Sequence, residues 1–292
     1  MGGLVLRPAR AINVRSSLMK VRFTRRRMLG CCAIGAAGIA LDAFIVEPRW
    51  LDVARYDVHV RDLAHANEGF RVAHLSDLHL GSVGGIHHRI ASELRTFAPQ
   101  LTFLTGDTIE SVAALPALDE LTALIAQATK TAVVAIAGNW EHWGHVPRES
   151  LTTSYKRAGA RFLSNESRLV DGMQVIAIDD FCSGNADAMR AVGGRAEGTS
   201  PRLVVTHAPG LFDALPPEFP DYALALAGHT HGGQVCAAGV PVWTPPGSGS
   251  FVDGRYEPAR GPLIVSRGIG MSVFGARLTC RPEMSLITLY RE

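Results

Sequence analysis

The sequence predicts a mixed α/β fold built on two β-sheets, and three observations lead to that prediction. In the first half of the chain, short apolar runs such as "FRVAHLSD" and "LTFLTGD" alternate with segments of helical period. The second half is rich in apolar runs and has few helical patterns. The 292 residues contain no internal repeat, and their 47% apolar content is enough for one substantial core. We therefore expect one folded domain over residues 47–292.

The expected elements of the first half follow the order of βαβ units. The segment "IHHRIASELRTFAP" has a helical period and stops at Pro99, and "LPALDELTALIAQATK" is a second amphipathic helix that starts near Pro116. A third strand "TAVVAIAGN" precedes a third helix "PRESLTTSYKRAG", so the first sheet should be mainly parallel. Further strands are expected at "MQVIAIDD", "PRLVVTHAPG", "DYALALAGHTHGGQV", "GPLIVSRGIG" and "MSLITLY", and the stretch "CSGNADAMRAVGGRAEGTSPR" should be irregular with one short helix.

Residues 1–46 have the pattern of a targeting segment. The first 27 residues contain eight Lys or Arg and no acid, and a weakly apolar Ala/Gly-rich run follows. The pair Arg25–Arg26, with Leu29 after it, resembles a twin-arginine export signal. The 19 residues from Met28 to Val46 are also just long enough to cross a ~30 Å hydrocarbon core, although Asp42 would be costly there. We predict export by the twin-arginine route to the periplasm or the outer face of the inner membrane, with the segment either cleaved or retained as an anchor.

Charge and cysteine content exclude several classes of protein. Because the eight N-terminal cations exceed the net charge of +2, the folded part is mildly acidic, which argues against a nucleic-acid-binding surface. Outside the targeting segment, Cys182, Cys236 and Cys280 are odd in number and lack metal-type spacing, so we expect small buried apolar residues rather than disulfides.

Potential metal ligands follow five of the expected strands. Strand ends at the carboxyl edge of an open sheet are where α/β folds place their sites, and a spacing of two in an extended segment puts both side chains on one side. The seven ligands expected to converge are Asp77, His79, Asp107, Asn139, His207, His229 and His231. Imidazole mixed with carboxylate suits Mn, Fe or Zn, and seven ligands suit two ions that share a bridging carboxylate ~3.5–4 Å apart.

The order of these motifs, D-x-H, G-D, G-N, H and G-H-x-H, resembles that of the calcineurin-like metallophosphoesterases. With "EPRW", "GHTHGGQV", "SRGIG", "RPEMSLITL" and the N-terminal segment, the chain is similar to the YkuE-like, twin-arginine-exported branch. The resemblance implies a four-layer α/β/β/α sandwich and hydrolysis of a phosphodiester or pyrophosphate, in a lipid-linked nucleotide such as UDP-diacylglucosamine. It also implies one ion on Asp77, His79 and His231, a second on Asn139, His207 and His229, and Asp107 as the bridge.

The segment "GNWEHWG" departs from the pattern of the family. The residue after the amide ligand is usually a His that protonates the leaving group, and here it is Trp140, which cannot act as a general acid. Three explanations remain open: His142 supplies the proton, the leaving group needs none, or activity is low. We therefore assign catalytic roles to Asp107, Asn139 and His142, with a solvent-facing loop position as the alternative for His142 and for Glu141. Trp140 and Trp143 would also suit an apolar wall for a lipid or a nucleobase.

Two weaker candidates for substrate contacts are His87, at an expected helix start near the metal motif, and Arg267 in "SRGIG". His74 is expected in the core or behind the ligands, and Gln234 at a turn behind the last metal pair. The main functional alternatives are a general envelope phosphodiesterase or phosphomonoesterase, and a metal-binding envelope protein with little turnover because of Trp140.

Overall fold

The computed structural model describes residues 25–61, 63–129, 131–193 and 200–292. Residues Leu41–Glu292 form one compact unit, and residues Met1–Ala40 form a second, which is described from Arg25 onward. Helix α1 covers Arg25–Leu41, and a π-helical turn over Asp42–Val46 and a 3-10 turn over Glu47–Arg49 follow it. By length and composition, Met28–Arg49 is long and apolar enough to cross a membrane. The remainder of the predicted signal, residues 1–24, lies outside the described residues.

The first sheet has the strand order β1-β14-β2-β3-β4-β5. The strands β2 (Phe70–Leu75), β3 (Leu101–Thr105), β4 (Ala132–Ile136) and β5 (Arg161–Phe162) are parallel neighbours. They are connected by helices α2 (Gly85–Phe97), α3 (Leu115–Thr129), the short α4 (Asn139–Trp143) and α5 (Arg148–Arg157). On the other side, β14 (Glu283–Arg291) pairs antiparallel with β2 and parallel with β1 (Asp52–Val60).

The second sheet has the strand order β12-β13-β9-β8-β7-β6. Its central strands β7 (Met173–Ala177), β8 (Arg202–Val205), β9 (Leu224–Ala227) and β13 (Leu263–Val265) are parallel. The outer strands β6 (Glu166–Val170) and β12 (Gly254–Tyr256) pair antiparallel with their neighbours. A small hairpin, β10 (Cys236–Ala237) with β11 (Val240–Pro241), stands apart from both sheets.

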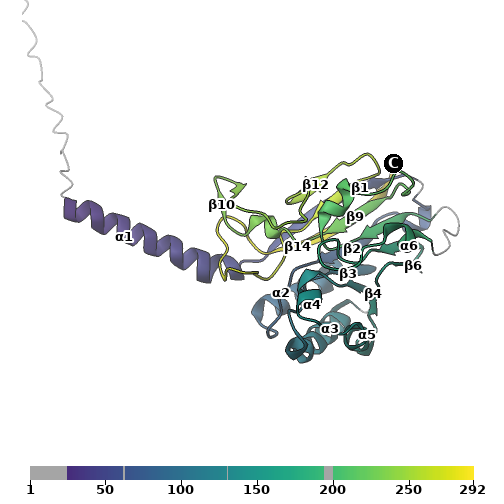
Figure 1. Ribbon diagram of the computed structural model, residues 1–292, viewed down its shortest axis with the longest axis horizontal. Coiled ribbons are helices and arrows are strands. Elements are labelled where there is room, and N and C mark those ends of the chain that lie inside the picture. Colours follow the sequence, from purple (N-terminus) through teal and green to yellow (C-terminus); the bar gives the residue numbers. More distant parts are fainter. Residues whose placement is uncertain (1–24, 62, 130, 194–199) are drawn as a thin grey trace, which may run out of the picture. The chain divides into compact units, whose positions relative to one another are not determined.

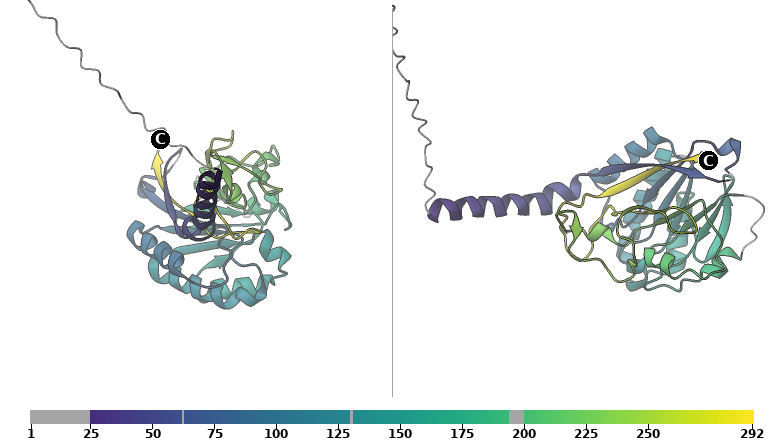
Figure 2. Two further views of the ribbon diagram at one scale, coloured as in Figure 1. Left: turned by 90° about the vertical axis from the view of Figure 1, so that its left-hand side faces the viewer. Right: turned by 90° about the horizontal axis from the view of Figure 1, so that it is seen from above.

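Three apolar layers hold the sheets and helices together (Figures 1 and 2). Residues of α2, α3 and α5 pack on the outer face of the first sheet, and residues such as Phe103 and Ile287 fill the space between the two sheets. The outer face of the second sheet packs against α6 (Ala188–Val192) and the 3-10 segment Pro209–Asp213. The predicted mixed α/β fold on two sheets is confirmed, and α6 is a short helix within the segment that was expected to be irregular.

Candidate metal centre and its cavity

The structure brings the seven predicted ligands together at the carboxyl ends of the strands that precede them. Two groups could each hold an ion: Asp77, His79 and His231 form one, and Asp107, His207 and His229 form the other, and the ligand atoms of each group lie within 4.8 Å of one another. Asn139 joins the second group, because its Oδ1 lies 2.8 Å from His229 Nδ1 and 3.1 Å from His207 Nε2. The two groups are adjacent, since His79 Nε2 lies 3.7 Å from Asp107 Oδ2.

The backbone at the site is in an uncommon conformation. Five of the seven residues are non-glycine residues in the left-handed region: Asp77 (φ 52°), His79 (φ 46°), Asp107 (φ 50°), His229 (φ 71°) and His231 (φ 52°). Such positions cost of order 1–3 kcal/mol each and persist only where the surroundings enforce them. Here the His229 amide donates to both Asp77 carboxylate oxygens at 3.0 Å, and the His79 amide donates to the Asp107 carbonyl at 2.9 Å. Strain held in this way at one place is typical of a functional site.

Two glycines of the motifs are required by the close approach of the two sheets. A Cβ on Gly106, which precedes Asp107, would lie 2.7 Å from His207 Nδ1. A Cβ on Gly228, which precedes His229, would overlap the Asp77 carboxylate. The glycines of the G-D and G-H motifs therefore allow ligands from different strands to reach one another.

The arrangement of hydrogen-bond donors and acceptors around His207 fits a cation. Its Nδ1 lies 2.7 Å from the carbonyl of Thr105, which can only accept, so Nδ1 carries the proton of the neutral ring. The Nε2 lone pair then lies 3.1 Å from Asp107 Oδ2 and 3.1 Å from Asn139 Oδ1. With the ring neutral, three acceptor atoms would face one another with no hydrogen between them, and a divalent cation would satisfy all three.

The pKa shifts indicate which ligands are ready to bind metal. Burial lowers the pKa of His207, but the carboxylates of Asp107, Asp77 and Asp180 together raise it, so the pKa ends well above its usual value. Without a cation, His207 therefore tends to hold a proton at the position that the cation would occupy. Burial, reinforced by neighbouring His207, lowers the pKa of His229, and burial together with His79 lowers that of His231 well below its usual value. Both rings are thus held neutral, which is the form that coordinates metal.

Glu141 fixes the loop that carries Asp107, and the sequence analysis did not identify this role. Its buried carboxylate accepts the amide of Asp107 at 2.9 Å and that of Gly138 at 2.9 Å through Oε2. Through Oε1 it accepts the amides of Thr108 at 2.7 Å and Ile109 at 3.1 Å. The solvent-facing alternative for Glu141 is therefore wrong, and its position three residues after Gly138, as in a capping box, was the available signal.

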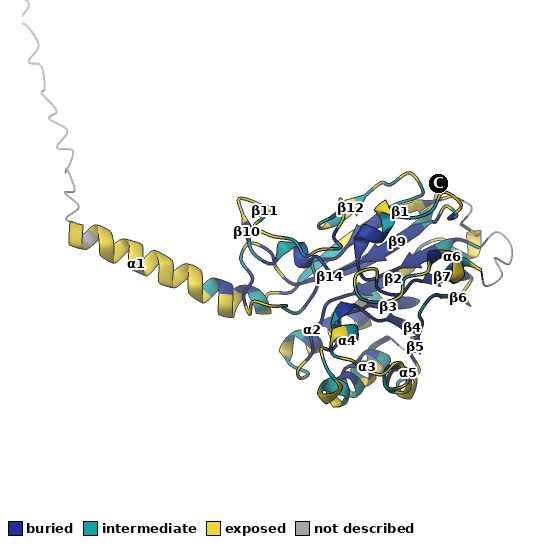
Figure 3. Cartoon of the chain, in the orientation of Figure 1, coloured by how far each residue is buried: buried dark blue, intermediate teal, exposed yellow. Residues whose placement is uncertain are grey.

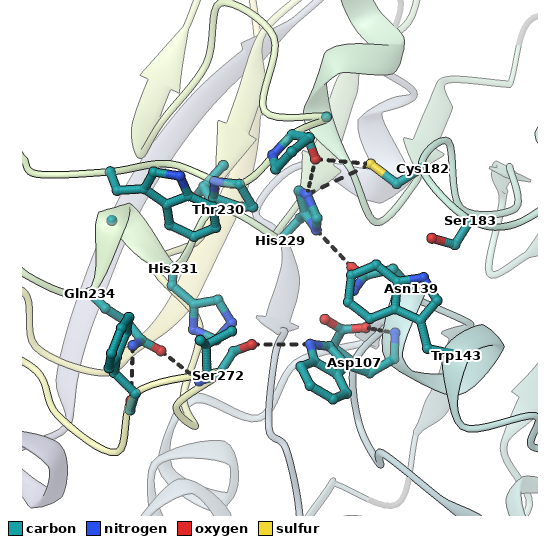
Figure 4. Close-up of a pocket in the computed structure, with 18 of the residues that line it drawn as sticks. Asp107, Asn139, Trp143, Cys182, Ser183, His229, Thr230, His231, Gln234 and Ser272 are labelled. Atoms are coloured by element: carbon teal, nitrogen blue, oxygen red, sulfur yellow. Dashed lines mark hydrogen bonds between the residues drawn. The ribbon is translucent and has the colours of Figure 1, made fainter.

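Trp140 lies at the cavity wall, and both of its N–H groups have partners. Its backbone amide donates to Asp107 Oδ1 at 2.8 Å, and its indole Nε1–H donates to Ser272 Oγ at 3.0 Å. The Ser272 amide in turn donates to Gln234 Oε1 at 2.6 Å (Figure 4). The indole N–H therefore connects α4 to the loop that carries Ser272 and is not free for a phosphoryl oxygen.

His142 contacts a different carboxylate from those at the metal centre. Its Nε2 lies 3.0 Å from Asp179 Oδ1, and this hydrogen bond raises the pKa of His142. Asp179 and Asp180 follow β7, and the Asp180 carboxylate accepts the amides of Cys182 and Ser183 at 3.0 and 2.6 Å. His142 thus joins α4 to the loop over residues 179–183, and among the described residues it is not part of the cavity lining.

The two weaker substrate candidates have structural partners instead. His87 Nδ1 accepts the amide of Gly84 at 2.9 Å and so stabilises the start of α2. Arg267 donates to Glu283 Oε2 and to Asp52 Oδ2, both at 2.6 Å. Neither side chain is among the described residues that line the cavity, so the structure does not support a substrate contact for them.

Other expectations near the site have mixed outcomes. His74 is buried, as expected, and its Nε2 lies 2.7 Å from Thr105 Oγ1. Cys236 and Cys280 are buried and free, but Cys182 is exposed, with its Sγ 3.7 Å from His229 Nε2. The prediction of a buried Cys182 is therefore wrong, because the residue lies on a loop at the cavity rather than on a strand.

A cavity of about 680 Å³ opens above the metal ligands. Asp107, Asn139, His229 and His231 lie at its polar end (Figure 4). Its walls are mostly apolar and come from four separate segments: Trp140 and Trp143 in α4, Phe181 after β7, Val242 and Trp243 after β11, and Val273 and Phe274 before β14.

A two-sheet α/β protein with carboxylates and imidazoles gathered at strand ends belongs to the class of metal-dependent hydrolases. The family model of the calcineurin-like phosphoesterases matches residues 70–233, which is more than half of the chain. The chain belongs to this family and is a metal-dependent phosphoester hydrolase that uses divalent metal cofactors.

Curated relatives share most of their length with the chain. It is 29% identical to the uncharacterized metallophosphoesterase YkuE of Bacillus subtilis, over 90% of this chain and 94% of that protein. It is 27% identical to the phosphodiesterase YaeI of Escherichia coli, over 91% of this chain and 99% of that protein. Among solved structures, a dimetal phosphatase from Danio rerio has a TM-score of 0.49 and 14% identity, and the match covers 76% of this chain and 93% of that chain.

Proposed function

We propose that the protein is a dinuclear-metal phosphoesterase that hydrolyses a phosphodiester or pyrophosphate bond in a substrate with a large apolar group. The observation that carries this proposal is the position of the two ligand groups at the polar end of a cavity whose walls are otherwise apolar. A small, fully polar phosphate ester would leave those walls in contact with water, whereas an amphiphilic substrate would cover them.

In this proposal, Asp77, His79 and His231 would hold one divalent ion, Asn139, His207 and His229 would hold the other, and both would share Asp107. When bound, two such ions would supply Lewis-acid stabilisation of the phosphoryl oxygens and would lower the pKa of the attacking water. Mn, Fe and Zn all suit this set of donors. The Glu110 carboxylate accepts His79 Nδ1–H at 2.8 Å, and the Thr105 carbonyl accepts His207 Nδ1–H, so both rings turn Nε2 towards the site.

The side chains near the metal centre favour a substrate whose leaving group departs without being protonated. The Trp140 indole already donates to Ser272, and His142 is bonded to Asp179 and is not among the described residues that line the cavity. In this proposal neither side chain serves as a general acid, so a leaving group of low basicity is preferred. A pyrophosphate bond to a nucleotide meets this requirement, and a lipid-linked nucleotide such as UDP-diacylglucosamine also has the apolar portion that the walls would contact.

A general envelope phosphodiesterase is the second candidate. The relative YaeI carries the name phosphodiesterase, and the centre itself would accept any diester with a weakly basic leaving group. A panel of lipid-linked and water-soluble diesters on one sample separates the two candidates, because only the first predicts that an apolar group raises kcat/KM.

For location, we propose the YkuE-like, twin-arginine-exported branch, with residues 1–46 as signal or anchor and residues 47–292 as the catalytic domain. Arg25 and Arg26 are exposed at the start of α1, and Met28–Arg49 meets the length and composition of a membrane span. The protein would then act in the periplasm or at the outer face of the inner membrane.

Asp107→Asn tests the dinuclear centre. The change removes the charge shared by two cations, so we expect about two metal equivalents in wild type, well below that in the variant, and loss of bis-p-nitrophenyl phosphate turnover. Asp119→Asn on α3, which breaks only an ion pair with Arg157, is the matched control and should keep both. Wild type that stays at one equivalent or fewer after reconstitution with Mn, Fe and Zn would refute the dinuclear proposal.

A further inference from the structure

Large exposed apolar side chains on the compact unit are concentrated in two places. Among the described residues of this unit, only Val112, Leu169 and Met189 lie elsewhere. The first group is the cavity rim, formed by Trp143, Phe181, Val242, Trp243, Val273 and Phe274, and Val240 of the hairpin lies beside it. The second group is the entry segment, residues 41–50, whose exposed members are Leu41, Phe44, Ile45, Val46 and Trp50. Val273 and Phe274 are more than 70% exposed, so the described residues leave these two rim side chains largely uncovered.

Hydrogen bonds join the entry segment to the loop that carries Val273 and Phe274. The Arg277 amide donates to the Ala43 carbonyl at 2.9 Å, and the buried Glu47 carboxylate accepts the amides of Thr279 (2.7 Å) and Cys280. The first residues after α1 are thus bonded to residues 277–280, which follow the exposed rim residues Val273 and Phe274 by a few positions.

The hairpin β10–β11 is attached to the same loop. Leu278 N–H donates to the Gln234 carbonyl and Cys236 N–H donates to the Leu278 carbonyl, both at 2.9 Å. Figure 3 shows that the hairpin is exposed beyond this attachment. Entry segment, loop and hairpin therefore form one connected block, and each of the three carries exposed apolar side chains.

The block also has the polar groups expected at the edge of a bilayer. The Arg281 guanidinium lies 3.7 Å from the centre of the Trp50 ring, at the end of the apolar stretch that begins at Met28. Tryptophan and arginine next to an apolar span are typical of the membrane–water interface, where the ring lies at headgroup level and the cation meets anionic lipid.

We propose that the cavity rim is a membrane-docking surface that inserts into the headgroup region of an anionic phospholipid bilayer, with the mouth of the cavity facing the lipid. The proposal rests on the membrane attachment proposed above, because the entry segment continues the apolar stretch. It goes beyond attachment by the N-terminus alone, since it assigns a second lipid contact to the catalytic unit. An amphiphilic substrate could then enter the cavity without crossing water.

Fluorescence quenching in the full-length protein tests the docking. The protein is reconstituted into vesicles of phosphatidylcholine and phosphatidylglycerol in which part of the phosphatidylcholine has brominated acyl chains, and bromine quenches tryptophan on contact. The difference between wild type and Trp243→Phe isolates the emission of Trp243. We expect that emission to be quenched, and the quenching to be lost in Val273→Asp with Phe274→Asp. Leu169→Asp, at an exposed site on β6, should retain it.

Two outcomes would overturn the docking surface: an unquenched Trp243 in wild type, and equal quenching in the double Asp variant. If Trp243 is unquenched and a dimer is lost in the double Asp variant, the rim is instead an interface between two copies. Flotation with the vesicles shows that each variant is still attached through its N-terminus. Because quenching needs no turnover, quenched Trp243 without phosphoesterase activity would refute only the proposed function, and activity without quenching would refute only the docking surface.

Discussion

Glu141→Gln, which replaces one carboxylate oxygen by an NH₂ group, is expected to be one of the most destabilising conservative substitutions near the site. In wild type the two carboxylate oxygens accept four backbone amides, two on each oxygen. Glutamine keeps one oxygen, and its NH₂ group places hydrogens against two of the amides. Those two donors are buried and lose their acceptors, while the volume of the side chain hardly changes.

The magnitude follows from the two lost bonds. An unpaired buried donor costs about 1–3 kcal/mol, so the variant should lose roughly 2–6 kcal/mol of unfolding free energy. A domain of this size shifts its Tm by about 2–4 °C per kcal/mol, so a loss of about 4 kcal/mol lowers Tm by roughly 8–16 °C. Metal affinity should fall as well, because Glu141 holds the backbone of Asp107, the proposed bridging ligand.

Calorimetry of the metal-free and metal-loaded protein measures both effects. Glu149→Gln, an exposed glutamate in the first turn of α5, is the matched control and should stay within about 0.5 kcal/mol of wild type. A Glu141→Gln protein that melts with the control and binds the same number of metal ions would show that the carboxylate does not hold the Asp107 loop.

Three further changes test other parts of the site and the chain. The Asp179 hydrogen bond raises the pKa of His142 above 6.5, so its stabilisation is complete below that pH and is lost as pH rises through the folded-state pKa. His142→Ala should therefore cost about 1 kcal/mol in urea unfolding at weakly acidic pH and almost nothing at alkaline pH, and a cost that does not change with pH would contradict this. Trp140→His should flatten a steep dependence of rate on leaving-group pKa by accelerating alkyl esters up to ~10²-fold; a shallow dependence in wild type would contradict this. Replacing the pair Arg25–Arg26 by two lysines should keep the protein in the cytoplasmic fraction, and export of that variant would refute the twin-arginine prediction.

The convergence of the strand-end ligands could be predicted from the sequence. Asp77, Asp107 and Asn139 each follow a short apolar run, and such runs in βαβ order become parallel neighbours whose carboxyl ends meet at one edge. His207 and His229 follow β8 and β9 in the second sheet for the same reason. The local sequence pattern was sufficient to predict this convergence, because it predicts the strands and the strand ends determine where the ligands lie.

The partners of polar side chains across long sequence distances could not be predicted. Arg267 follows β13 and is bonded to Asp52 in β1 and Glu283 in β14, so its charge is compensated by carboxylates of the first sheet. His142 similarly meets Asp179, which follows a strand of the other sheet. No periodicity encodes such pairs, because they depend on how two sheets pack and not on the conformation of either segment.

Most residues of the cavity walls could not be predicted from the sequence for a related reason. Phe181, Trp243 and Phe274 lie in irregular segments, and no apolar period connects them. Trp143 was expected only as one possible wall residue, and the rest of the wall appears when loops are joined by bonds such as that between Ser272 and Gln234. Irregular loops therefore shape the part of the site that selects a substrate.

Trp140 links the chemistry of the site to its walls. Where the family resemblance led us to expect a histidine, this chain has an indole whose N–H donates to Ser272 and whose ring packs edge-on against Trp143 at 5.3 Å between centroids. Tryptophan in place of histidine therefore removes a proton donor, but it also adds apolar surface to the cavity wall and fixes the loop that carries Phe274. A substrate with a weakly basic leaving group loses little when the proton donor is absent, and it gains contacts with the added wall. If this reasoning is right, Trp140→Phe, which keeps the wall but not the N–H, should weaken binding of amphiphilic diesters through the loosened loop while leaving the dependence on leaving-group pKa unchanged. A steeper or shallower dependence in that variant would mean that the indole N–H does take part in the chemical step.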